Sequence, residues 1–312
     1  MPELPEVQTI VSDLHKILPG LKIADVETDW EKMFKNCSFE NFKKEVVGEK
    51  ILDVRRIGKN ILIDLTSNKT ILVHQKMTGH FLYGKWEMVT PPVAGEASWL
   101  GKEAGAIRDD PQNRFIHLVF DLSNNKQLAL SDLRKFAKVL LWPTGKLSEL
   151  KDINNLGPDP TAPDFDFKKF QERLAPLATG LSPPQTGQAG KKGKIKTVLM
   201  DQSVFAGIGN IYSDEILWLA GIHPLRQVSS LIQEELKSIF TSTKKILKKA
   251  IEARGTSDSD YRDPSGNKGG YQKMLYVYGL EGEKCQKKDG GIIARLKIGG
   301  RSAHFCPVHQ KM

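Results

Sequence analysis

Apolar residues recur at helical spacing near the start of the chain. Within residues 5–18 (PEVQTIVSDLHKIL) they stand at i, i+3, i+4 and i+7, which predicts a helix with one buried stripe: Val7, Ile10, Val11, Leu14, Ile17 and Leu18. Pro5 is tolerated in the first turn, because its missing N–H would have no partner there. The Pro-Gly pair at 19–20 then ends the helix.

From residue 21 to about 145 the pattern changes to short apolar runs separated by Gly, Asn and Ser. The runs are ILIDL (61–65), TILVH (70–74), FIHLVFDL (115–122) and KVLLW (138–142). Several short strands without an intervening helical pattern predict a β-sandwich or barrel-like domain. Residues 90–113 are expected to form a long loop, longer than a compact domain usually carries.

A segment rich in Pro and Asp, residues 157–168, marks the next boundary. Beyond it the apolar spacing is helical in 168–178, 196–205, 211–220 and 229–253. Residues 180–194 (GLSPPQTGQAGKKGK) have the composition of a flexible tether. The final stretch returns to short runs, MLYVYG, IIARLKIG and RSAHFC, which predict a small β-hairpin module. The pattern thus gives an α+β chain with three parts: 1–150, 151–273 and 274–312.

The distribution of charge indicates which kind of partner the chain could bind. The net charge is +9, and it is uneven: residues 1–150 hold 21 basic and 20 acidic side chains, whereas residues 151–312 hold 25 and 17. A basic second half fits a polyanion, since each neutralised phosphate releases counterions. A merely basic soluble protein would have the same composition, so charge alone does not decide.

Other features narrow the class of protein. No apolar run approaches the ~20 residues that span a bilayer. The start of the chain carries Glu where a secretory signal would carry Lys or Arg. Three cysteines, Cys37, Cys285 and Cys306, do not make a disulfide framework. We therefore expect no membrane partner and a cytoplasmic location, associated with the nucleoid if the source is bacterial.

The first six residues carry candidate chemistry. Removal of Met1 would leave Pro2 with a free secondary amine, whose pKa in the α-amino range of about 7.7–8.0 leaves a neutral, nucleophilic fraction near pH 7. Glu3 is suited to general acid–base work, and Glu6 lies one helical turn further on. Pro and Glu are also common at helix starts for structural reasons, so these residues do not decide alone.

Residues 196–224 (KTVLMDQSVFAGIGNIYSDEILWLAGIHP) predict helix, Gly-flanked turn and second helix. Gly207 and Gly209 would let backbone N–H groups approach a phosphate, and Asn210 would open the second helix at its positive end. This segment and the MPELPEV start together resemble the formamidopyrimidine-DNA glycosylase family, the MutM-type branch of the Fpg/Nei superfamily. The similarity runs from Pro2 to Gln310, interrupted by residues 90–113 and 180–194.

The resemblance implies a fold and an activity. The fold would be a β-sandwich with a leading helix, then a helix–two-turns–helix domain with a β-hairpin finger. The activity would be excision of oxidised purines, such as 8-oxoguanine and formamidopyrimidines, from duplex DNA, followed by β,δ-elimination at the abasic site. By position, Pro2 would be the nucleophile, Glu3 the catalytic acid and Glu6 a supporting carboxylate, while Lys59 would contact phosphates around the lesion.

Further residues match the family's DNA contacts. Met77, Arg134 and Phe136 match the trio that fills the hole left by the everted base, a task suited to two apolar wedges and one guanidinium. Lys196, Asn210 and Arg301 match phosphate contacts. Residues 254–272 match the loop that closes over an everted oxidised purine. Met77 and Phe136 would otherwise be ordinary core residues, and that alternative stays open from the residues themselves.

The finger departs from the family pattern of two C-x2-C pairs. Cys285 and Cys306 keep the first and third places, His309 takes the fourth, and the second falls on Lys288 or Asp289. Cys285, Asp289, Cys306 and His309 could form a mixed tetrahedral zinc site, because a protonated lysine cannot be a ligand. A zincless finger held by hairpin pairing and apolar packing is the alternative, and both remain open.

Two other functions remain as alternatives. The first is an endonuclease VIII-like glycosylase that prefers oxidised pyrimidines. The second is a non-catalytic nucleic-acid-binding protein, because helix–two-turns–helix modules also occur in ribosomal and topoisomerase proteins. The PELPE start favours an enzyme. Its expected partner is duplex DNA with a damaged base, bound by a monomer.

Overall fold

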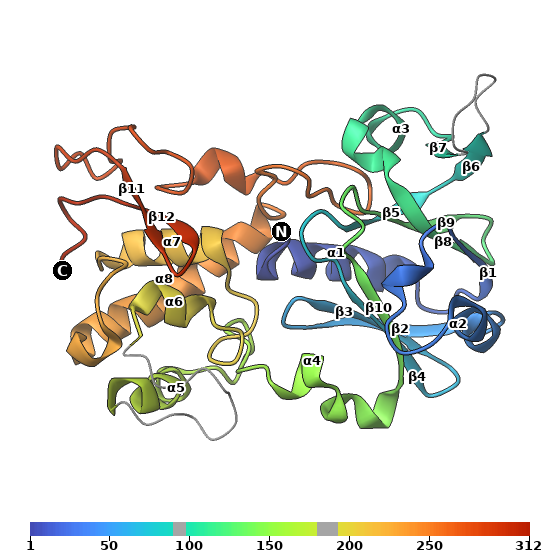
Figure 1. Cartoon of the computed structure of the whole chain (residues 1–312). Coiled ribbons are helices and arrows are strands. Elements are labelled where there is room, and N and C mark those ends of the chain that lie inside the picture. Colours follow the sequence, from blue (N-terminus) through green and yellow to red (C-terminus); the bar gives the residue numbers. More distant parts are fainter. Residues whose placement is uncertain (90–97, 180–192) are drawn as a thin grey trace. The chain divides into compact units, whose positions relative to one another are not determined.

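The computed structural model describes residues 1–89, 98–179 and 193–312 (Figure 1). The chain divides into two compact units. Unit 1 comprises residues 1–150 and 253–272, and unit 2 comprises residues 151–252 and 273–312. The segment 253–272 therefore belongs to the same compact unit as the N-terminal half, although it follows the helices of unit 2 in the sequence.

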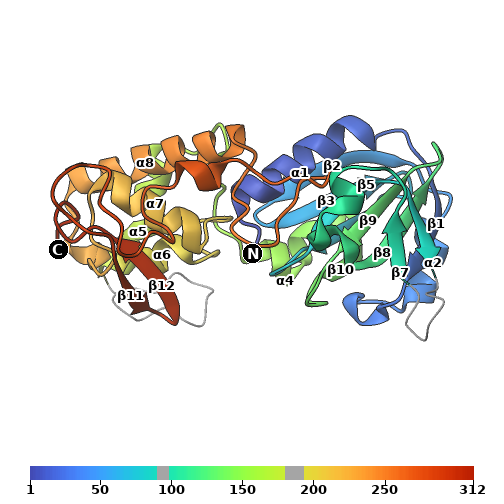
Figure 2. The same cartoon turned by 90° about the horizontal axis from the view of Figure 1, so that it is seen from above.

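Two four-stranded antiparallel sheets form the frame of unit 1 (Figure 2). The first has the order β1 (Ile23–Thr28), β8 (Ile116–Leu122), β9 (Gln127–Ser131), β5 (His80–Gly84). The second has the order β10 (Lys138–Pro143), β4 (Lys69–His74), β3 (Asn60–Leu65), β2 (Ile51–Ile57). One apolar cluster draws on both sheets and on helix α1 (Leu4–Ile17), which confirms the predicted sandwich with a leading helix.

Helix α1 buries the stripe that its spacing predicts. Val7, Ile10 and Leu14 are at most 1% exposed and join the sandwich core. A second helix, α2 (Phe39–Val46), was missed within the β-rich stretch. It is short, capped by Ser38, and buries Phe42 and Val46. The short 3-10 helix η1 (Glu31–Met33) precedes it.

The prediction of one long loop over 90–113 is wrong for its second part. Strand β6 (Trp86–Val89) pairs with β7 (Ser98–Gly101), and α3 (Ala106–Asp109) and η2 (Pro111–Arg114) follow. Residues 90–97 lie outside the described part of the chain. The described segment is ordered because it covers apolar residues on the other face of the first sheet. Trp86, Trp99 and Ile107 pack against Leu82, Ile116, Val119 and Ala129.

Unit 2 is mainly helical. Its helices are α4 (Lys151–Asn154), α5 (Phe167–Thr179), α6 (Ile195–Met200), α7 (Asn210–Ala220) and α8 (Gln233–Glu252). The helix expected over 196–205 ends earlier, at Met200, and residues 201–209 form the turn before α7. Short 3-10 helices are η3 (Thr144–Glu149) in unit 1, η4 (Val228–Ser230) in unit 2 and η5 (Tyr271–Met274) where the chain returns to unit 2. Of the tether, residues 180–192 lie outside the description.

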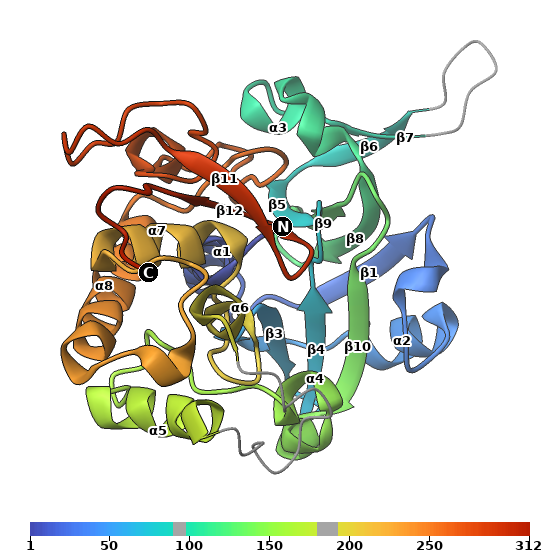
Figure 3. The ribbon, with the colours of Figure 1, turned by 60° about the vertical axis from the view of Figure 1, so that its left-hand side comes forward.

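The finger is a two-stranded hairpin, β11 (Ala294–Ile298) with β12 (Arg301–Phe305) (Figure 3). Gly299 and Gly300 join the strands with φ of +55° and +80°, the two positive values that a type I′ turn requires. The strand predicted over 274–279 is absent; η5 ends at Met274, and turns follow. Among the described helices, none combines the length and the apolar character needed to cross a bilayer.

Candidate active site

The N-terminus of α1 is built around three of the predicted catalytic residues. Pro2, Glu3 and Glu6 are all buried, with Glu3 3% and Glu6 1% exposed. Glu3 caps α1 in a reciprocal capping box: its carboxylate accepts from the N–H of Glu6, and its own N–H donates to Glu6 Oε2 at 2.8 Å. The capping box fixes both carboxylates beside Pro2.

Glu6 also connects α1 to the lid segment, which we define as residues 254–272. The N–H of Thr256 donates to Glu6 Oε1 at 2.7 Å. Gly255 has a φ of +79°, and a Cβ atom there would come within 2.8 Å of Glu6 Oε1. Only glycine allows this approach. One carboxylate thus holds the helix start with one oxygen and the lid with the other.

Two side chains anchor the lid further. Arg254 pairs with Asp13 of α1 and, at 2.7 Å, with Asp263. Tyr261 is 5% exposed and packs in the sandwich core. Its burial, with the negative charge of Glu6 nearby, raises the pKa of its hydroxyl well above the usual value. The lid is therefore an integral part of unit 1.

Lys59 lies in the turn between β2 and β3 and is 6% exposed. Of its basic neighbours, Arg55 donates from Nε to Asp64 at 2.6 Å. Arg56 donates to Gln8 of α1 at 2.9 Å and to the carbonyl of Gly58 at 2.9 Å. Both arginines next to Lys59 are thus committed to hydrogen bonds within unit 1.

The predicted wedge residues lie on two turns that are tied together. Met77 is half-buried in the β4–β5 turn, whereas Arg134 and Phe136 are exposed in the β9–β10 turn. Thr78 donates its hydroxyl to Asp132 and accepts the N–H of Arg134 at 3.1 Å. The ring of Phe136 is 50% exposed and lies 4.6 Å from the guanidinium of Arg134.

Each of these turns contains a lysine in the left-handed region, Lys76 with φ +56° and Lys135 with φ +55°. A non-glycine residue there costs energy, and such residues gather at functional sites. The exposure of Phe136 disfavours the core-packing alternative for this residue. Its role as a wedge remains a prediction.

Lys196 is buried, whereas a phosphate contact would require it at the surface. Its side chain is fully buried, and Nζ donates to Asp214 at 2.5 Å and to Ser213 at 3.1 Å. The other oxygen of Asp214 accepts the backbone N–H of His304, on β12, at 2.9 Å. A phosphate contact by Lys196 would require this ion pair to open. In the structure, Lys196 links α6, α7 and the finger.

Asn210 opens α7, as predicted. Its Oδ1 is buried and has no hydrogen-bond partner among the described residues. In the preceding turn, the N–H of Gly207 donates to the side chain of Gln202 at 2.8 Å, so this donor is already used. Gln202 also donates to the carbonyls of Met200 and Ile208. The side chain of Gln202 therefore holds this turn together from inside.

The four predicted metal ligands gather in one place. Donor atoms of Cys285, Asp289, Cys306 and His309 all lie within 4.8 Å of one another. Cys285 Sγ is 3.6 Å from His309 Nδ1, and Cys306 Sγ is 3.6 Å from Asp289 Oδ2. Bonds of about 2.0–2.3 Å to a central zinc ion place tetrahedral ligands at such separations. Of the two candidates for the second place, Asp289 has its carboxylate within this group.

The surroundings of His309 are compatible with its binding a metal ion. Nε2 lies 3.1 Å from the carbonyl of Trp218, and Nδ1 lies 2.8 Å from Asp289 Oδ2. A neutral ring that donates from Nε2 to this carbonyl presents the lone pair of Nδ1 to the cluster, the usual second contact of a metal-binding histidine. A Cβ atom at residue 291 would lie 2.3 Å from Cys306 Sγ, so Gly291 keeps the cluster open.

Arg301, predicted to contact phosphate, is exposed at the start of β12.

Glu215, Asp214 and Arg262 are structural residues that sequence reasoning missed. Glu215 is fully buried and accepts the N–H groups of residues 276–278 at 2.9–3.0 Å. The sequence does contain a signal for Glu215: two adjacent acidic residues lie within the apolar helical run 211–220 (DE in IYSDEILWLA). Buried carboxylates need partners, so such residues are expected to bond other parts of the chain.

Comparisons with known proteins agree with this architecture. The chain matches the family model of the formamidopyrimidine-DNA glycosylase N-terminal domain over residues 1–139 and that of the H2TH domain over residues 156–261. Formamidopyrimidine-DNA glycosylases of Pelotomaculum thermopropionicum and Listeria innocua are 36% and 37% identical, over 100% of both chains in each case.

Solved structures give the same result. The complex between a mutant Lactococcus lactis FPG and a Fapy-dG containing DNA is similar with a TM-score of 0.80 and 33% identity, over 100% of each chain. A complex of Lactococcus lactis Fpg with an abasic site containing DNA has a TM-score of 0.79 and 33% identity, over 99% of this chain and 100% of that one. The fold is thus that of a two-domain H2TH protein. The chain belongs to the formamidopyrimidine-DNA glycosylase family.

Proposed function

We propose that this protein excises oxidised purines, including 8-oxoguanine and formamidopyrimidines, from duplex DNA and then cleaves the strand as an abasic-site lyase. One observation carries the proposal. Pro2, Glu3 and Glu6 are held together at the start of α1, in a chain that resembles, along its whole length, a protein solved with Fapy-dG containing DNA.

In the proposed reaction, Met1 is removed and the amine of Pro2 attacks C1′ of the damaged nucleotide. The bond between C1′ and the base breaks, and the departing base takes up the proton that the attacking amine loses. Glu3 then protonates the ring oxygen O4′ as the C1′–O4′ bond opens, which leaves a Pro2–sugar iminium ion. Because the amine is secondary, the iminium nitrogen has no proton to lose. It withdraws electrons from C2′, which permits loss of a C2′ proton with the 3′-phosphate, and then loss of the 5′-phosphate.

The remaining predicted residues would position the DNA. Met77 and Phe136 would replace the stacking of the extruded nucleotide, and Arg134 would bond the orphaned base. Lys59, Asn210 and Arg301 would contact phosphates. We assign Lys196 a positioning role, supported by its buried pair with Asp214.

The domains would divide the work. Residues 1–150 would carry catalysis, 151–273 would bind DNA through the helix–two-turns–helix, and 274–312 would present Arg301. We expect a monomer that acts on genomic DNA in the cytoplasm or nucleoid.

A zinc ion is proposed for the finger, bound by Cys285, Asp289, Cys306 and His309. Its part would be structural: it would stiffen the hairpin that aims Arg301. Purified protein should contain about one zinc per chain by metal analysis. Asp289→Ala and His309→Ala should lose the metal, whereas Lys288→Ala should retain it. A metal-free wild-type protein with unchanged thermal stability under chelation would support the zincless alternative.

Borohydride trapping tests the reaction itself. Wild-type protein should form a covalent adduct with 8-oxoguanine duplex, and its intact mass should lack Met1. Pro2→Gly should lose trapping, and Glu3→Gln should lose base excision while it still binds DNA. Undiminished trapping by Pro2→Gly, or retained Met1 in active protein, would refute the mechanism. Faster excision of thymine glycol than of 8-oxoguanine would favour the endonuclease VIII-like alternative.

A further inference from the structure

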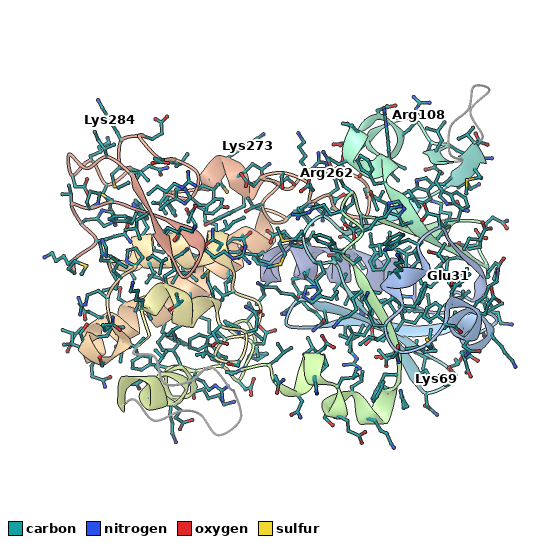
Figure 4. The ribbon with its side chains drawn as sticks, in the orientation of Figure 1. Glu31, Lys69, Arg108, Arg262, Lys273 and Lys284 are labelled. Atoms are coloured by element: carbon teal, nitrogen blue, oxygen red, sulfur yellow. The ribbon has the colours of Figure 1, made fainter. Side chains whose placement is uncertain are left out.

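The lid is bonded to the rest of unit 1 through Arg262 as well as through Arg254 and Thr256. Arg262 of the lid forms a bidentate ion pair with Asp110, from Nε to Oδ2 at 2.7 Å and from Nη2 to Oδ1 at 3.1 Å. The two side chains are only 4% and 17% exposed. Figure 4 labels Arg262, beside the short segment that carries α3. Burial would raise the pKa of Asp110, but Arg262 and the backbone N–H of Gln112 together hold the pKa below its ordinary value.

The same guanidinium also shapes the lid from inside. Arg262 Nη1 donates to the carbonyls of Ser259 at 3.1 Å and Tyr261 at 2.8 Å. Arg262 therefore holds its own loop closed with one nitrogen and attaches it to Asp110 with the other two. A lysine could not make this planar set of contacts.

A second fastening lies a few residues further along the chain. Asn113 donates to the carbonyl of Gly266 at 3.2 Å and to that of Ala106 at 2.8 Å. Gly266 has a φ of +82°, and a Cβ atom there would lie 2.7 Å from Asn113 Nδ2. The carbonyl of Pro264 in turn accepts the N–H of Tyr83, on β5, at 2.7 Å.

Asn113 also bonds His80, which follows the turn that carries Met77. His80, only 1% exposed, lies 3.0 Å through Nε2 from Asn113 Oδ1. Because the Asn113 amide nitrogen already donates to two carbonyls, its oxygen is the acceptor and His80 is the donor. His80 follows Met77 by three residues at the start of β5. Asn113 thus bonds both the lid and the strand that leads from the Met77 turn.

We propose that residues 105–114 are a clamp that keeps the lid ordered for capture of the extruded base, with Asp110, Asn113 and Arg262 as positioning residues. The inference rests on the proposed function and adds a source of substrate selectivity to it. A lid that is already ordered loses less conformational entropy when it closes on a base. An abasic site offers no base to the lid, so strand cleavage there does not depend on the clamp.

The test compares two substrates and one physical readout. Single-turnover rates are measured on a formamidopyrimidine duplex and on an abasic-site duplex, with hydrogen exchange of peptides covering residues 257–268. Asp110→Asn and Arg262→Gln should lower base excision by roughly 10-fold to 100-fold, leave abasic-site cleavage within about twofold, and speed exchange in the lid. Arg108→Gln is the matched control, since Arg108 lies in the same segment but forms its ion pair with the neighbouring Asp109 and not with the lid.

A charge-swapped variant, Asp110→Arg with Arg262→Asp, should recover lid protection and part of the excision rate. This keeps the test decisive if a single variant is unstable. Unchanged lid exchange in both single variants, or equal loss on both substrates, would overturn the clamp. If wild-type protein excises no base, the proposed function fails, and lid exchange alone then decides whether the clamp exists.

Discussion

At the scale of single residues, Phe136 combines features that packing alone does not explain. Its ring is half-exposed, lies against the guanidinium of Arg134, and follows a lysine in the left-handed region. Phe136→Ala should lower excision from duplex DNA by roughly 10-fold, because stacking on one base is worth about 1–3 kcal/mol. The free energy of unfolding should change by less than about 0.5 kcal/mol, as for other exposed positions.

Leu133 provides the control, since it lies in the same turn and is 46% exposed. Leu133→Ala should leave excision unchanged in the same single-turnover assay. Equal rates for Phe136→Ala and wild type would remove Phe136 from the proposed wedge.

Two cations assigned to phosphate by resemblance differ in burial, and salt dependence separates them. Arg301 is exposed, whereas Lys196 is fully buried against Asp214. Arg301→Ala should reduce the slope of log K against log salt by about 0.9, the value for one phosphate contact. Lys196→Met, combined with Asp214→Asn to avoid an unpaired buried charge, should weaken binding without changing the slope. Equal slope changes for both would show that Lys196 reaches phosphate after all.

At the scale of elements, the stretch after η5 is attached to α7 through Glu215. Burial raises the pKa of this carboxyl from 4.5 to about 7, against the opposing effect of three backbone N–H donors. The folded protein therefore keeps a proton that the unfolded chain releases above pH 4.5. The stabilisation is fully present below that pH and is lost as the pH rises through about 7.

Urea unfolding between pH 5 and 8 should thus show a free energy of unfolding that falls with pH, on the order of 2 kcal/mol from this group. Glu215→Gln should be less stable at pH 5 and should have a flatter profile, because the amide does not titrate and keeps one acceptor oxygen. Parallel profiles for the two proteins would contradict the prediction.

The sequence predicted those elements in which one local pattern matches one buried face. Helix α1 and strands β3, β4, β8 and β10 follow directly from their apolar runs. It missed α2, whose Phe42 and Val46 are buried in the sandwich core, and the α3 segment, whose Ile107 is only partly buried against the first sheet. The strand expected over 274–279 failed because its hydrogen-bond partner is the Glu215 carboxylate, which no periodicity reveals.

The candidate site divides in the same way. Family motifs located Pro2, Glu3 and Arg301, and ligand chemistry favoured Asp289 over Lys288. The burial of Lys196 and the pairing of Arg262 with Asp110 depend on residues 18 and 152 positions away. Long-range pairs of this kind cannot be read from one sequence, since any surface arginine has the same local pattern.

At the scale of the whole molecule, the chain leaves unit 1 after Leu150 and returns for residues 253–272 only. This returning segment is part of the structure of unit 1. It supplies the Thr256 donor to Glu6, the Arg254 partner of Asp13, and Tyr261 in the sandwich core. Without it, Glu6 and Asp110 lose partners and the core loses an aromatic ring.

A fragment of residues 1–150 should therefore be unstable on its own. Loss of a buried aromatic side chain costs about 3–5 kcal/mol, a large part of the stability of an ordinary domain. The same fragment joined through a flexible linker to residues 253–272 should unfold cooperatively at a higher temperature in circular dichroism melts. Tyr261→Ala in the linked version should remove most of that gain, whereas Asp258→Ala, at an exposed lid position, should not. If the unlinked fragment melts at the same temperature as the linked one, residues 253–272 are a passive cover, and the ordering that we ascribe to the lid must come from bound DNA.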